Sequence, residues 1–158
     1  MLVSDAAVLA RTLMNEHGFG HWTLNFDRAV RRAGYCSFRR QRISLSHHFV
    51  SLNPVEEVKD TILHEIAHAL DGPRPSHHAH DERWKAICKR IGCRPERCYK
   101  AEDVVMPPSK WLAICGGCQR EFPRHRYPKR QRYCAKCGRI HGVLIFKLRR
   151  EHASARCA

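Results

Sequence analysis

The stretch of sequence that decides the fold runs from residue 55 to residue 72 and reads VEEVKDTILHEIAHALDG. Its apolar residues recur every three or four positions, which is the period of a helix with one buried face. We expect Asn53 to cap this helix and Pro54 to occupy its first position. Gly72 and Pro73 end it. The sequence therefore predicts an amphipathic helix here, the most clearly marked element of the chain.

Within this helix, residues 64–68 match the pattern H-E-x-x-H. Histidines four positions apart lie one above the other on one helix face, so His64 and His68 can reach a single metal ion. Glu65 follows His64 directly and therefore projects beside that ion, where it can take a proton from a water molecule as general base. The pattern predicts a catalytic zinc site for metal-assisted hydrolysis, above all of peptide bonds.

A catalytic zinc site usually has three protein ligands and one open position, so a third ligand is expected. The metzincin pattern would place Gly and His where this sequence has Asp71 and Arg74, which excludes that subclass. The remaining candidates are histidines and glutamates that follow the helix: His77, His78, His80, Glu82, Glu96 and Glu102. From the residues alone the choice among them stays open.

The elements around the central helix predict an α+β fold. A first helix is expected from Ser4 or Asp5 to a stop at Gly18, and a later one from an N-cap at Asp81 to Gly92. Alternating apolar residues predict three strands, at residues 22–26, 35–38 and 42–50. Three short strands after a helix favour a small antiparallel sheet, packed on the helices that carry the zinc site.

The C-terminal part of the chain predicts a second, structural zinc site. Pro107-Pro108 has the composition of a linker, which gives a catalytic domain at 1–106 and a small module at 107–158. Four cysteines in this module form two C-x2-C pairs separated by fifteen residues, the spacing of a zinc ribbon: Cys115, Cys118, Cys134 and Cys137. With four thiolate ligands such a site is closed, so its zinc is structural.

The positive charge of the chain predicts a nucleic-acid partner. The formal net charge is +14, and residues 120–150 hold eleven Lys or Arg and one acidic residue. We expect the following basic residues to contact DNA: Arg120, Arg124, Arg126, Lys129, Arg130 and Arg132. Interleaved aromatic residues, Phe122, Tyr127 and Tyr133, suit base stacking and hence single-stranded or distorted DNA. A second basic group near the strand turns could extend this path: Arg28, Arg31, Arg32, Arg39, Arg40 and Arg42.

The sequence also predicts the compartment. The first seventeen residues are amphipathic and do not have the order of a signal peptide, and no apolar stretch approaches the length of a membrane span. We therefore expect a cytoplasmic protein without a membrane partner, associated with the nucleoid if it is bacterial. In a reducing compartment the nine cysteines serve as metal ligands or free thiols. The free thiols are expected to be Cys36, Cys88, Cys93, Cys98 and Cys157.

The residues HEIAHAL at 64–70, Gly72-Pro73, the His-rich loop and HDERW at 80–84 together resemble the SprT-like metallopeptidases. The resemblance covers about Leu9 to Gly92, and the ribbon is a common appendage. It implies that His80 is the third zinc ligand, that Asp81 stands where the family usually has Gly, and that Trp84 is the family's aromatic residue. It also implies a protein substrate attached to DNA or covering it.

Two other functions are compatible with the same residues. The first is a non-catalytic, nucleic-acid-binding zinc protein whose H-E-x-x-H site is inactive, although retention of Glu65 argues against it. The second is a hydrolase of non-peptide amides. The main hypothesis has two zinc ions per chain, one catalytic and one structural.

Overall fold

The computed structural model describes residues 1–73, 79–96 and 104–149. The chain divides into two compact units, Met1–Pro107 and Pro108–Ala158. Helices and a small sheet make up the first unit, whereas short strands dominate the second, so the chain has the mixed α+β structure that was predicted. None of the helices in the described part of the chain is long and apolar enough to cross a membrane.

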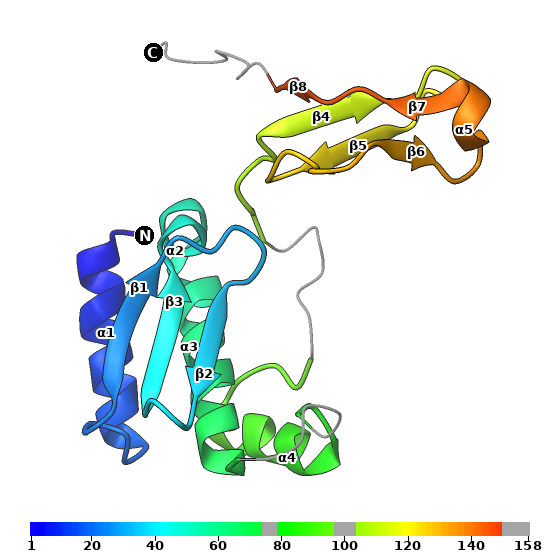
Figure 1. Cartoon of the computed structure of the whole chain (residues 1–158). Coiled ribbons are helices and arrows are strands. Elements are labelled where there is room, and N and C mark those ends of the chain that lie inside the picture. The colour runs from blue at the N-terminus through cyan, green and yellow to red at the C-terminus, as the bar shows by residue number, and fades with distance from the viewer. Residues whose placement is uncertain (74–78, 97–103, 150–158) are drawn as a thin grey trace. The chain divides into compact units, whose positions relative to one another are not determined.

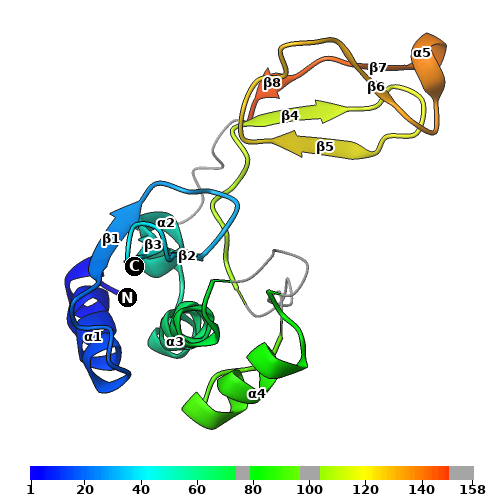
Figure 2. The ribbon, with the colours of Figure 1, turned by 60° about the horizontal axis from the view of Figure 1, so that its bottom comes forward.

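The first unit is a three-stranded sheet with helices on one face (Figures 1 and 2). Its elements in chain order are α1 (Val3–Glu16), β1 (Thr23–Asp27), β2 (Gly34–Ser37), β3 (Arg42–Ser46), α2 (His47–Leu52), α3 (Val55–Asp71) and α4 (Glu82–Ile91). Helices α1 and α3 lie side by side against the sheet, and α4 packs on α3. Fully buried side chains from the sheet and from helices α1, α3 and α4 form the core, among them Met14, Ile43, Leu45, Ile62, Ile66 and Trp84.

The sheet is mixed, with the strand order β1-β3-β2. β2 pairs with β3 in the predicted antiparallel manner, with Gly34 opposite Leu45. β1 pairs with β3 in parallel, with Thr23 opposite Arg42, and here the expectation of a fully antiparallel sheet is wrong. Residues 28–33 carry the chain past the end of β3 to its far side, so the third strand inserts between the first two. An alternating apolar pattern fixes the face of a strand but not its direction, which is why the sequence did not reveal this.

The strand predicted at residues 42–50 ends at Ser46, and a short helix follows it. The Ser46 hydroxyl accepts a hydrogen bond from the Phe49 N–H at 3.2 Å, which caps the first turn of α2. Phe49 and Val50 are both fully buried, which a helix allows but an alternating strand does not. The predicted strand is therefore too long, because the cap at Ser46 starts a helix where the alternating pattern indicated a strand.

Helix α3 ends as predicted but begins differently. Pro54 lies at the N-cap position, and no side chain caps the helix. The Asn53 side chain instead donates to the carbonyls of Phe49 and Val105, each at 2.8 Å, and accepts from the Val105 N–H at 2.7 Å. Asn53 thus fastens the chain after α4 to the end of α2, and the predicted N-cap role is wrong.

The capping predicted for α4 is confirmed at both ends. The Asp81 carboxylate accepts from the N–H groups of Arg83 and Trp84, at 3.1 and 3.3 Å. Gly92 follows the last helical residue with φ 79°, in the left-handed region where a residue with a side chain is strained. The Asp81 cap matters for function because it fixes the position of the residue before it, His80.

The second unit contains short strands and one helical turn (Figure 1). Its elements are β4 (Trp111–Ile114), β5 (Glu121–Arg124), β6 (Arg132–Cys134), α5 (Gly138–His141), β7 (Gly142–Leu144) and β8 (Lys147–Leu148). β4 pairs with β5 and β8, and β6 pairs with β7. β7 and β8 therefore belong to two different sheets. The small core of this unit contains Ala113, Cys115, Cys134, Leu144 and Phe146.

Candidate metal centres

Helix α3 brings two histidines to one side of the first unit. Its other side chains, Ile62 and Ile66 among them, anchor it in the core. His64 and His68 are half-buried, and their ring centroids lie 5.0 Å apart. This is the geometry that a spacing of four residues gives on a helix.

His80 approaches both of these rings from the residue before the α4 cap. Its Nε2 atom lies 3.4 Å from Nε2 of His64, and its ring centroid lies 4.7 Å from that of His68. One ring nitrogen from each of the three histidines lies within 4.8 Å of the others. The structure therefore brings together His64, His68 and His80, which are sixteen positions apart at their extremes.

These three donors fit a zinc ion. Zinc bound tetrahedrally by imidazole nitrogens at 2.0–2.1 Å holds them about 3.3 Å apart, close to the 3.4 Å between His64 and His80. Burial, helped by the neighbouring imidazoles, lowers the pKa of His64 to about 3, and burial lowers that of His68 to about 4. Both rings are therefore neutral at physiological pH and offer lone pairs, as metal ligation requires.

Glu65 is buried on the side of α3 that faces β2. Its side chain is 7% exposed, and the backbone N–H of Cys36 donates to its carboxylate. Burial raises the pKa of Glu65 to about 8, although the charge of Arg32 and the Cys36 hydrogen bond act in the opposite direction. A carboxyl group with a pKa near neutrality is suited to accept and release a proton during turnover.

Trp84 contacts the rings of all three histidines. It is fully buried in the core. Its ring centroid lies 4.8 Å from that of His64, 5.3 Å from that of His68 and 4.7 Å from that of His80. Its Nε1 atom has no hydrogen-bond partner among the described residues. Packing against all three rings restricts their orientations, a role that the sequence did not indicate.

The other candidates for a third ligand are not part of this cluster in the described residues. Glu82 is 87% exposed and pairs with Lys85 at 2.7 Å. Glu96 is also exposed and does not join the histidines. His77, His78 and Glu102 lie outside the described residues.

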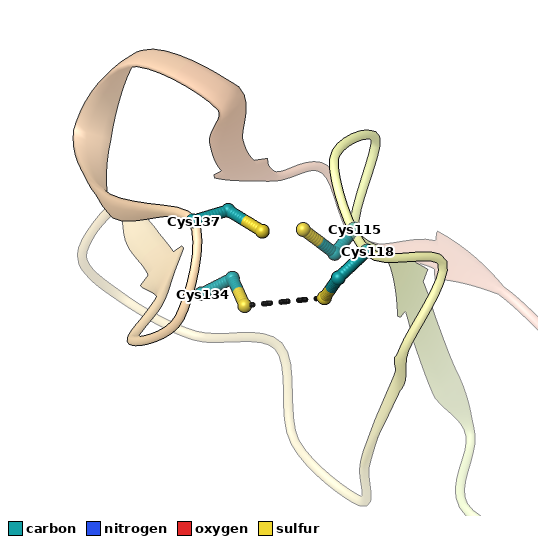
Figure 3. A group of neighbouring side chains, drawn as sticks. All are labelled: Cys115, Cys118, Cys134 and Cys137. Carbon is teal, nitrogen blue, oxygen red and sulfur yellow. Dashed lines mark hydrogen bonds between the residues drawn. The ribbon is translucent and has the colours of Figure 1, made fainter.

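The four cysteines of the second unit converge from two turns of the chain (Figure 3). Their sulfur atoms lie within 4.8 Å of one another, and those of Cys118 and Cys134 are 3.6 Å apart. Zinc–sulfur bonds of 2.3 Å in a tetrahedron give a separation of about 3.8 Å, so this group also fits zinc. A Cβ atom on Gly117 would lie 2.9 Å from the Cys137 sulfur, which explains the glycine in the first turn.

Backbone hydrogen bonds prepare part of this group for metal binding. Donation from the N–H groups of Cys118 and Gly117 lowers the pKa of Cys115 to about 7. Burial and the neighbouring sulfurs raise the pKa of Cys137 to about 12. Close thiols cannot all ionise without a cation between them, which again favours a bound metal. In the described residues, Cys36, Cys88 and Cys93 are free thiols, as predicted.

All six basic residues expected to contact DNA are exposed in the second unit: Arg120, Arg124, Arg126, Lys129, Arg130 and Arg132. Tyr127 lies among them and meets Trp111 edge to face, with ring centroids 4.8 Å apart. Trp111 pairs with Arg124 across β4 and β5. This aromatic pair was only half predicted, because Trp111 lies outside the basic run.

The second basic group of the sequence is divided by the sheet. Arg28, Arg31 and Arg32 lie in the connection between β1 and β2, whereas Arg39 and Arg40 lie in the turn between β2 and β3. These two connections are at opposite ends of the strands. The six arginines therefore do not form a single path.

Fold and donor sets define a mixed α+β protein with a helix-borne three-histidine group and a separate four-cysteine group. The sequence model of the SprT-like family matches residues 7–103, more than half of the chain. The chain therefore belongs to the SprT-like family.

Two relatives illustrate this membership. The chain is 27% identical over 147 residues to Protein SprT of Glaesserella parasuis serovar 5 (strain SH0165), covering 89% of this chain and 92% of that protein. It is 31% identical over 107 residues to the DNA-dependent metalloprotease SPRTN of Xenopus tropicalis, covering 63% of this chain but 23% of that protein. The second relative is thus a much longer protein, of which this chain matches one part.

Proposed function

We propose that the chain is a zinc-dependent metallopeptidase that hydrolyses peptide bonds in proteins bound or crosslinked to DNA. The observation that carries the proposal is the convergence of three imidazoles beside the buried carboxyl group of Glu65. Kinship with a DNA-dependent metalloprotease supports the substrate class. His64, His68 and His80 would hold the catalytic zinc, and the four ribbon cysteines a structural one, so we expect two zinc ions per chain.

Glu65 performs the proton transfers in the proposed reaction. Zinc, when bound, supplies Lewis-acid activation of the water and of the scissile carbonyl group. The Glu65 carboxylate accepts a proton from the water as the water oxygen bonds to the carbonyl carbon. It then delivers this proton to the amide nitrogen as the carbon–nitrogen bond breaks, giving a carboxylic acid and an amine.

The second unit is the proposed DNA-binding module. Its exposed arginines and lysine suit phosphate contacts, and the rings of Trp111 and Tyr127 suit stacking with unpaired bases. Single-stranded or distorted DNA is therefore the expected ligand. We place the boundary between the catalytic domain and this module at 106/107. We expect the protein in the cytoplasm, on the nucleoid in a bacterial cell, because proteins bound to DNA lie there.

Activity is tested with the zinc-loaded protein, its Glu65→Gln variant and a Glu56→Gln variant that changes an exposed carboxylate on the same helix. Each is incubated with a DNA-binding protein, with and without single-stranded DNA, and fragments are followed on a gel. We expect cleavage by the wild type and by Glu56→Gln only. Equal cleavage by Glu65→Gln would exclude Glu65 as the base.

DNA binding is tested by fluorescence anisotropy with single-stranded and duplex oligonucleotides over a range of salt concentrations. An Arg124→Ala/Arg126→Ala variant loses two phosphate contacts, so its log–log salt slope should fall by about 1.4 for a single strand. A matched variant in the first unit, Arg28→Ala/Arg31→Ala, should retain the wild-type slope. The reverse result would move the DNA site to the first unit.

The exposed basic surface also favours one alternative, a nucleic-acid-binding zinc protein without catalysis. In that case wild type and Glu65→Gln would be equally inert although two zinc ions are bound and DNA is retained. Offering small amide substrates beside protein substrates in the same assay separates the third possibility, a non-peptide amidase.

A further inference from the structure

Glu65 packs against the edge strand β2 at a position without a side chain. A Cβ atom built on Gly34 would lie 2.6 Å from Oε1 of Glu65, 2.7 Å from its Cγ and 2.9 Å from its Cδ. Two positions along the same strand, the Cys36 N–H donates to the Glu65 carboxylate. Strand β2 thus leaves room for the proposed base at Gly34 and donates a hydrogen bond to it from the Cys36 backbone.

The glycine is needed for space and not for its backbone freedom. Gly34 is not among the residues with positive φ, so an alanine could adopt the same backbone conformation. The strand itself has little room to retreat, because Gly34 is paired in register with Leu45 and the Ser46 N–H donates to the Ala33 carbonyl at 2.6 Å. An added methyl group must therefore displace the Glu65 side chain.

We propose that Gly34 is a positioning residue for Glu65. Its missing side chain admits the carboxylate against β2, where the Cys36 N–H holds it at a fixed place relative to His64 and His68. The role rests on the proposed function of Glu65 as general base, and Gly34 acts through Glu65.

The first test is Gly34→Ala in the full chain, loaded with zinc. A displacement of the base by about 1 Å is expected to lower kcat roughly 100-fold. KM should change by less than about threefold and zinc content should stay at the wild-type value, because the histidines do not move. Tyr35→Phe, on the other face of the same strand, is the control and should leave kcat unchanged. A Gly34→Ala variant with wild-type kcat would overturn the proposal.

The second test is a double-mutant cycle on thermal unfolding, which needs no activity. The steric conflict in Gly34→Ala should lower the unfolding temperature by roughly 5 to 10 °C. In a Glu65→Ala background there is no side chain to displace, so the same substitution should cost less than about 2 °C. If Gly34→Ala alone does not fold, folding of the double variant supports the proposal as well.

An equal loss in both backgrounds, or failure of both to fold, would show that Gly34 acts on the strand and not through Glu65. These outcomes differ from failure of the proposed function, which appears as equal turnover by wild type and Glu65→Gln, or as equal inertness of both, whatever residue 34 is.

Discussion

Replacing Glu65 by glutamine is expected to stabilise the zinc-free protein at neutral and alkaline pH, although it removes the proposed base. Burial raises the pKa of Glu65 from 4.5 to about 8. Between these values the unfolded chain loses a proton that the folded chain keeps, so the free energy of unfolding falls as the pH rises through this window. Above pH 8 the carboxylate is charged in both states, and the folded state carries the full penalty of its burial.

The pKa shift sets the size of the effect. One pKa unit corresponds to 1.36 kcal/mol, so the penalty is roughly 3 kcal/mol at pH 7 and approaches about 5 kcal/mol above pH 8. Glutamine has no such titration, and its amide oxygen can still accept the Cys36 N–H. The Glu65→Gln variant should therefore gain stability relative to wild type as the pH rises and show almost no difference near pH 4.5.

The assay is urea unfolding in the presence of a chelator at pH 5, 7 and 8.5, followed by tryptophan fluorescence. The lowered pKa values of His64 and His68 also make stability pH-dependent, but both proteins share them, so they cancel in the difference. Glu16→Gln, at an exposed site, is the control and should stay within about 0.5 kcal/mol of wild type at each pH. A difference for Glu65→Gln that is independent of pH would refute the reasoning.

Three further predictions concern the rest of the fold. Asn53→Ala removes three hydrogen bonds of a buried side chain, two of them to Val105, and should lower the free energy of unfolding in urea by about 2–3 kcal/mol while speeding amide exchange at Val105. Arg94→Met breaks half-exposed ion pairs with Glu57 and Asp60 and should cost about 1 kcal/mol, measured in the same way and diminishing with added salt. Cys134→Ser should lower the zinc content measured by atomic absorption by one ion per chain, without loss of the helical circular dichroism of the first unit.

Local spacing predicted what a single helix determines. The positions of His64, Glu65 and His68 on α3 follow from its periodicity, and the ends of α4 follow from Asp81 and Gly92. The third histidine, by contrast, lies outside this helix, and the resemblance to a family and its place at the start of the next helix selected it from its neighbours. The structure now provides a physical reason, because the Asp81 cap holds His80 next to α3.

Long-range contacts were not predictable in the same way. That Gly34 and the Cys36 N–H contact Glu65 depends on β2 being the edge strand beside α3, and the parallel pairing of β1 with β3 creates this order. Asn53 has the sequence context of a helix cap, yet its amide binds a segment more than fifty residues away. In each case a partner distant in sequence decides the role of the residue, and a pattern of neighbours carries no information about it.

The burial of His64, His68 and Glu65 destabilises the zinc-free protein but favours the binding of a divalent cation. The neutral imidazoles of His64 and His68 contribute lone pairs but no charge, and Glu65 is forced toward its neutral form because its carboxyl group is shielded from water. In so weakly solvated a place the attraction between a carboxylate and a nearby cation is much stronger than in water. A bound ion should therefore restore the charge on Glu65 at neutral pH, so the residue becomes a base when the site is filled. Exclusion of water from Glu65 between α3 and β2 thus has two effects. It lowers the stability of the zinc-free protein, and it prepares Glu65 for proton transfer in the zinc-bound protein.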